Sequence, residues 1–147
     1  MSDSFSSSVR PPIVAGMFYP ADSKELRQEV EQYLADIPAN SEEKKIYSAI
    51  VPHAGYIYSG KVAAYAYARL REQPFTVAVV IGPSHKEYFD RVSVYPGAAF
   101  RTPLGEYYVN EALREKLIKQ SDAVIASNIG HRAEHSIEVQ IPFLQVV

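Results

Sequence analysis

The sequence contains no cysteine and no tryptophan among its 147 residues. The absence of cysteine excludes disulfide bonds and thiolate zinc sites within this chain. The net charge is only −2 and lysine and arginine form no cluster, so we expect no nucleic-acid partner. No apolar run approaches the ~20 residues of a membrane span, and the N-terminus lacks the basic start and apolar core of a signal peptide. We therefore expect a cytoplasmic protein with no membrane partner.

Sequence motifs of several common enzyme classes are also missing. There is no Walker A loop, no GxGxxG loop and no Ser-His-Asp order, so nucleotide binding and triad hydrolysis are weak interpretations. The apolar content of 47% and the length fit one domain with a substantial core. We predict a disordered polar tail over residues 1–8 and a single domain over residues 9–147. Eleven tyrosines suit a polar-aromatic pocket or an interface, although core filling explains them as well.

The chain is organised around a pattern of apolar run, proline and histidine that occurs twice. Residues 47–51 and 76–81 are typical of buried strands, and a proline stops each before His53 or His85. A helix expected over residues 61–71 would join them in a right-handed crossover, placing both imidazoles at the rim where α/β sheets bind ligands. Two convergent imidazoles begin a metal site. The alternative, a pair of solvated or turn-capping histidines, is about equally favoured.

Periodicity elsewhere completes an α/β pattern. Apolar residues at helical spacing predict helices over residues 23–37 and 111–120, capped by Asp22 and Asn110. Residues 96–105 are rich in turn formers and indicate a long loop, for which a solvated excursion is slightly favoured over a functional role. Alternation and short apolar runs predict further strands at residues 91–95, 106–109 and 123–126.

Residues 134–144 are the hardest segment to assign. Their apolar residues fit the alternation of a strand and the spacing of a helix equally well. Pro142 argues against the interior of a long helix and against a central strand. Glu134 and Glu138 lie four residues apart, and an ordinary charged helix surface explains them about as well as a functional role. His131 is expected to be a loop residue rather than a ligand.

Four motifs carry a family resemblance. They are Val-Pro-His-Ala-Gly-Tyr-Ile-Tyr-Ser-Gly at 51–60, Ile-Gly-Pro-Ser-His at 81–85, Phe-Arg-Thr-Pro-Leu-Gly at 100–105 and Glu-His-Ser-Ile-Glu-Val-Gln-Ile-Pro-Phe-Leu at 134–144. In this order they closely resemble the Memo-like family, also known as the AmmeMemoRadiSam system protein B family. The opening segment 9–20 matches as well, so the resemblance covers residues 9–145.

The resemblance implies a three-layer α/β/α fold with a mixed, largely parallel sheet, similar to LigB-type class III extradiol dioxygenases in fold and in the position of the metal site. It makes His53 and His85 the metal ligands, with iron or copper the expected metal. It also implies a helix near residue 134 that carries three catalytic candidates towards the pocket, namely Glu134, His135 and Glu138. The predicted pocket residues are Tyr56, Tyr58, Ser84 and Arg101.

Members of that family are about twice as long as this chain, and their second half carries a cysteine that joins the two histidines around the metal. We therefore interpret the chain as an N-terminal half, truncated at its C-terminal end. The leading hypothesis is metal-dependent redox or oxygenase-like chemistry on a small-molecule or peptide ligand. The alternatives are a non-catalytic binding or scaffold module, which holds a peptide or protein partner in the same pocket, and an inactive truncated remnant. Assembly into a homo-oligomer is compatible with each of these.

Overall fold

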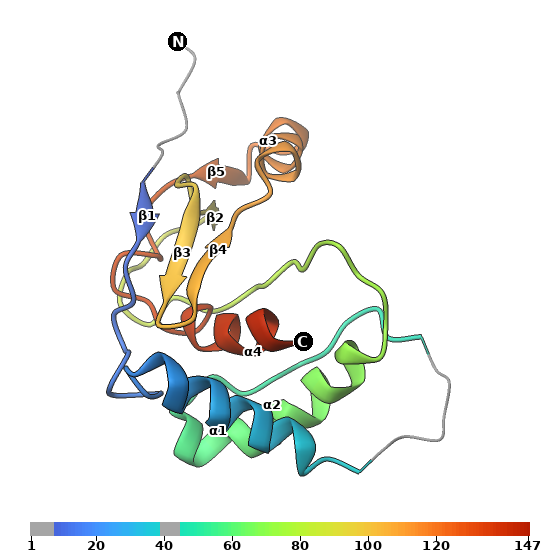
Figure 1. Cartoon of the computed structure of the whole chain (residues 1–147). Helices are drawn as coiled ribbons and strands as arrows, with labels where there is room; N and C mark the ends of the chain where they lie inside the picture. Colours follow the sequence, from blue (N-terminus) through green and yellow to red (C-terminus); the bar gives the residue numbers. More distant parts are fainter. Residues whose placement is uncertain (1–7, 39–44) are drawn as a thin grey trace.

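The computed structural model describes residues 8–38 and 45–147, which form an α/β arrangement of helices and two small sheets (Figure 1). In the first sheet, β1 (Val9–Arg10) pairs in parallel with β3 (Ala99–Thr102), and β3 pairs antiparallel with β4 (Gly105–Tyr108). In the second sheet, β2 (Val92–Val94) is parallel to β5 (Val124–Ala126). The predicted α/β class, with mixed sheet pairing, is confirmed.

Two helices begin where their capping residues predict. The Asp22 carboxylate accepts the amides of Lys24 and Glu25 at the start of α1 (Ser23–Ala35). Asn110 caps α3 (Glu111–Gln120) by accepting the amide of Leu113 at 3.0 Å. Within the described ranges, no helix combines the length and the apolar character needed to cross a membrane.

Helix α2 (Tyr56–Arg71) begins earlier than residue 61, where the sequence predicted its start. Gly60, the residue just before the predicted start, lies inside the helix. A Cβ atom at this position would come within 2.5 Å of the Tyr33 ring, so the glycine allows α2 to approach α1 closely. Figure 1 shows these two helices side by side.

The two strands predicted at residues 47–51 and 76–81 are wrong, and so is the crossover between them. Both segments are irregular, and Ile50, Val79 and Ile81 are exposed. Their apolar composition was correctly recognised, but a strand also requires a neighbouring strand, which the described residues do not supply. The loop predicted over residues 96–105 is also wrong, because it contains β3.

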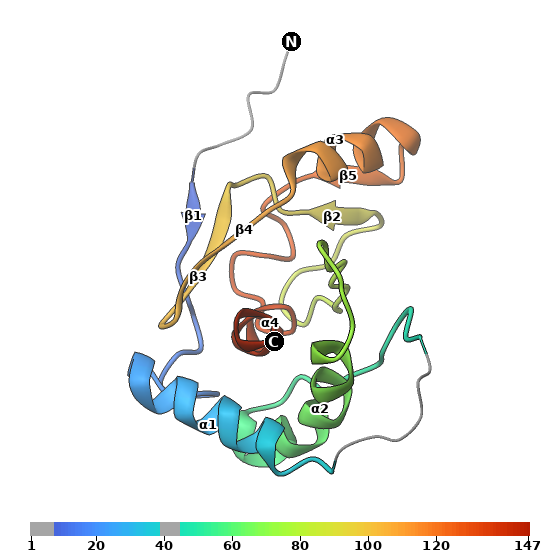
Figure 2. The ribbon, with the colours of Figure 1, turned by 45° about the vertical axis from the view of Figure 1, so that its right-hand side comes forward.

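The chain's last helix fills the middle of the molecule. A short 3-10 turn, η1 (Glu138–Gln140), leads into α4 (Ile141–Val146), and Pro142 sits in the first turn, where its missing N–H is tolerated. Phe143 is buried and stacks on Tyr67 with 4.8 Å between ring centroids. In both views α4 lies between the α1–α2 pair and the first sheet (Figures 1 and 2). This packing anchors the loop before η1, and that loop carries Glu134 and His135.

The tail predicted over residues 1–8 lies outside the described residues apart from Ser8. The Ser8 carbonyl accepts the amide of Ala98 at 2.9 Å, which continues the contact between β1 and the sheet.

Candidate metal centre

Three imidazole rings converge from three separate loops. The ring centroids of His53 and His85 are 5.2 Å apart, and that of His135 lies 4.9 Å from His85 and 6.0 Å from His53. His53 comes from the loop before α2, His85 from the loop that follows the extended segment after α2, and His135 from the loop before η1. The structure therefore brings His53 and His85 together although the strands predicted to deliver them are absent from the described residues.

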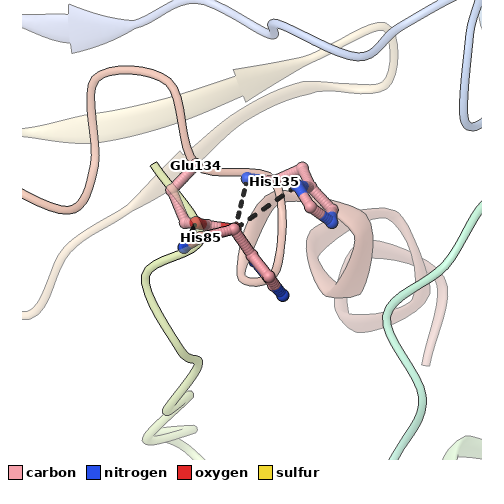
Figure 3. A group of neighbouring side chains, drawn as sticks. All are labelled: His85, Glu134 and His135. Atoms are coloured by element: carbon pink, nitrogen blue, oxygen red, sulfur yellow. Dashed lines mark hydrogen bonds and ion pairs between the residues drawn. The ribbon is translucent and has the colours of Figure 1, made fainter. Parts of the chain in front are cut away.

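The Glu134 carboxylate contacts two of these three histidines, His85 and His135 (Figure 3). Its Oε1 atom accepts the backbone amides of His135 at 2.8 Å and Ser136 at 2.9 Å, and it lies 3.0 Å from Nδ1 of His85. Its Oε2 atom accepts the backbone amide of His85. One buried carboxylate thus fixes both the backbone and the ring of His85.

These contacts set the charge and the tautomer at the site. Burial would raise the pKa of the Glu134 carboxyl, but the donors on His85, Ser136 and His135 outweigh it and lower the pKa to about 2. The carboxylate is therefore ionised at neutral pH and can only accept, so Nδ1 of His85 carries the proton. In a neutral His85 imidazole this leaves the lone pair on Nε2, which is the arrangement that binds a metal.

His135 is kept neutral by its surroundings. Burial lowers the pKa of this imidazole, and the nearby His85, His53 and Lys86 lower it further, against the opposing effect of Glu134. Its ring also packs against Phe18, with 4.8 Å between the centroids. A neutral imidazole beside His85 can accept a proton or bind a metal.

The donor set fits a metal ion. Candidate ligand atoms of His85, Glu134 and His135 all lie within 4.8 Å of one another, a group that does not include His53. Glu134 already accepts four hydrogen bonds, so its arrangement matches a carboxylate that orients a ligating histidine better than a ligand itself. Imidazole nitrogens suit iron, copper and zinc, and do not suit magnesium or calcium.

Glu138, predicted to act beside Glu134, lies instead in a buried network with the N-terminal segment. Its carboxylate accepts from Arg10 at 2.7 Å, from the Tyr19 hydroxyl at 2.7 Å and from the amides of Ile13 and Val14. The structure thus corrects the predicted placement, because these four donors use Glu138 to tie residues 10–19 to η1.

Arg10 is the residue that the sequence analysis missed. Its guanidinium also donates to the carbonyls of His131, at 2.6 Å, and of Glu134, so it links β1 to the loop that carries Glu134 and His135. Arg10 and Glu138 are 128 positions apart in the sequence, and no local pattern marks such a pair. The available signal was a single arginine in the otherwise uncharged opening segment 9–20.

The four predicted pocket residues do not gather at the imidazoles. Tyr56 is buried in the core, where its hydroxyl donates to the Val139 carbonyl at 2.7 Å, and Tyr58 is exposed on α2. The Ser84 hydroxyl donates to the Glu87 carbonyl at 2.6 Å, next to His85 in the chain. Arg101 forms an exposed ion pair with Glu106 on the neighbouring strand. Of the four, the structure places only Ser84 on the loop that carries His85.

Glu134→Gln is expected to change how stability depends on pH. The folded pKa of about 2 lies below the ordinary 4.5, so the carboxylate stabilises the fold above about pH 4.5. That contribution, about 3 kcal/mol at most, is lost as the pH falls from about 4.5 towards 2. In urea unfolding with a chelator present, the stability gap between wild type and variant should shrink between about pH 6 and about pH 3. A gap that stays constant over this range would contradict the assignment.

The sequence of this chain is similar to a known family and to several curated proteins. The family described as "Memo-like protein" matches residues 10–147. A MEMO1 family protein of Ignicoccus hospitalis is 44% identical over 93% of this chain, and one of Metallosphaera sedula is 43% identical over 92% of it. One of Thermoplasma acidophilum is 40% identical over 92% of the chain. The matches cover 50% to 51% of these relatives, so the chain spans about half their length.

Proposed function

This chain belongs to the Memo-like protein family, and on that premise we propose that it binds iron or copper through His53 and His85 and supports redox or oxygenase-like chemistry. The observation that carries the proposal is the hydrogen-bond set of Glu134, which fixes the ring and backbone of one imidazole beside two others. Carboxylate–histidine–metal arrangements use this contact to raise ligand basicity and to set the tautomer.

A bound iron or copper ion would supply reversible one-electron chemistry and open positions for a ligand. The residues of this chain do the positioning. Glu134 orients His85 and holds the proton on Nδ1, which leaves Nε2 available. His53 offers the second imidazole from the loop before α2, at a ring separation of 5.2 Å.

His135 is proposed to accept a proton from a bound small molecule or peptide. Its pKa lies below the ordinary value, so the ring is unprotonated near pH 7. Glu134 is unsuited to that task, because a carboxyl with a pKa of about 2 does not take up a proton at neutral pH. Of the three predicted catalytic candidates, we therefore assign Glu134 as an orienting carboxylate and His135 as a basic imidazole.

The orienting role predicts that Glu134→Gln weakens metal binding by about 10- to 100-fold. Glutamine keeps the shape of the side chain but removes the charge. Its NH2 group would also replace one acceptor oxygen and face N–H groups that need an acceptor. Affinity for Fe(II), measured anaerobically by competition with a chromophoric chelator, gives the comparison. Glu106→Gln is the matched control, since this exposed carboxylate pairs with Arg101 and should leave affinity unchanged. Equal affinity of Glu134→Gln and wild type would remove the orienting role.

A further inference from the structure

An apolar groove of about 440 Å³ lies between the two extended segments 46–51 and 75–82. Residues of both segments line it, and Tyr67 and Leu70 of α2 and Leu144 of α4 also contribute. His53 and Ser136 lie on its lining as well, so the groove reaches the metal centre. Figure 2 shows the segment after α2 running past α4 towards β2.

The second of these segments has the side-chain pattern of a strand that is covered on both faces. Ala78 and Val80 pack against the core, whereas Val77, Val79 and Ile81 point outwards and are exposed. Both alternating sets are apolar, which is typical of strands buried on two sides and unusual for a surface segment. Ile50 and Tyr47 add exposed apolar area on the opposite wall.

Most of the backbone of the groove walls has no backbone partner within the described part of the chain, although the Ile46 amide donates to the Gln73 side chain at 2.8 Å. None of the backbone–backbone hydrogen bonds found there involves residues 47–51 or 75–81. Extended backbone with free amides and carbonyls is a template for a further strand. Added strands of this kind obtain affinity from main-chain hydrogen bonds and specificity from alternating side chains.

We infer that this groove is the docking surface for an extended polypeptide segment, and that the segment belongs to the half of the family sequence that this chain does not span. The relatives carry about as much sequence again as the portion matched here. A second copy of this chain is a poorer occupant, because its own strand-like segment already packs Ala78 and Val80 against its own core and is not free to enter the groove. The occupant would cover the apolar walls, pair their backbone and border His53.

The test mixes the purified chain with the polypeptide that comprises the unmatched half of the Metallosphaera sedula relative. Co-elution in size-exclusion chromatography reports binding, and hydrogen–deuterium exchange identifies the residues that the added polypeptide protects. We expect exchange to slow at least about tenfold in residues 46–51 and 75–82. Val79→Asp should abolish binding and protection. The control is Val62→Asp, the same change at a comparably exposed valine on α2 (61% against 67%), outside the groove.

Absence of co-elution would overturn the proposal, as would co-elution with protection confined to other residues. Concentration-dependent protection of the same segments in the chain alone would show that the occupant is a second copy, which also rejects the occupant named here. All mixtures contain a chelator, so the result does not depend on metal binding. Failure of the metal proposal and failure of this one are therefore distinguishable.

Discussion

The His53→Ala/His85→Ala variant is expected to bind iron or copper at least about 100-fold more weakly than the wild type. This loss equals or exceeds the largest loss expected for Glu134→Gln, which removes only the orienting carboxylate. The reason is that both proposed ligands disappear, while Glu134 is left with backbone donors only. Elemental analysis after anaerobic purification without chelator gives the first measurement. Oxygen consumption by the iron-loaded chain, with a reductant present, should fall in parallel.

The matched control removes a histidine outside the cluster. His131 is buried, with its Nε2 atom 3.1 Å from the Ser93 carbonyl and its ring beside Tyr95. The His131→Asn variant should keep its metal, provided that circular dichroism shows it to be folded. Metal retained by the His53/His85 double variant, or lost equally from the His131 variant, would mean that these two imidazoles are not the ligands.

Arg10→Met is expected to lower the free energy of unfolding by about 3 kcal/mol, because breaking a buried ion pair from one side leaves a buried charge with fewer partners. Arg10 and Glu138 have side-chain exposures of 5% and 1%, so water cannot replace the lost contact. Tyr19 and two backbone amides still donate to Glu138, so the expected loss of unfolding free energy lies at the low end of the range for a broken buried ion pair. A loss of this size is a large share of the 5–15 kcal/mol typical of a domain.

Arg101→Met tests whether burial is the reason that Arg10→Met lowers the free energy of unfolding. Arg101 also pairs with a glutamate in the same sheet, but its side chain is 55% exposed, so we expect a change of about 0–1 kcal/mol. Urea unfolding of both variants measures the difference. Similar losses for the two arginines would contradict the role given to the Arg10 network. Met at position 10 should also loosen the loop of His131 and Glu134, whose carbonyls it no longer binds.

The elements that the sequence predicted well are those determined by neighbouring residues. Asp22 and Asn110 cap their helices through amides two or three positions away, so residue type and spacing suffice. The apolar runs at 47–51 and 76–81 were recognised, but their assignment as strands depended on partners that spacing cannot supply. The start of α2 was predicted too late, at residue 61, because the reason for a glycine at position 60 is the close approach of Tyr33 from another helix, which the local sequence does not show.

The residues of the candidate site also fall into those that local sequence indicates and those that only the structure identifies. A proline followed by a histidine pointed to His53 and His85, and the family resemblance added Glu134 and His135. Geometry was needed to separate Glu134 from Glu138, since both are carboxylates of one segment and only their distant partners differ. Those partners lie 128 and 49 positions away along the chain.

Pulsed electron paramagnetic resonance of the copper-loaded chain tests the central claim most directly, because it detects the remote nitrogen of each imidazole bound to the metal. The account predicts two coordinated imidazoles in the wild type, one in either single variant, His53→Ala or His85→Ala, and two in His135→Ala. A spectrum without imidazole coupling, or one unchanged by both substitutions at His53 and His85, would contradict it.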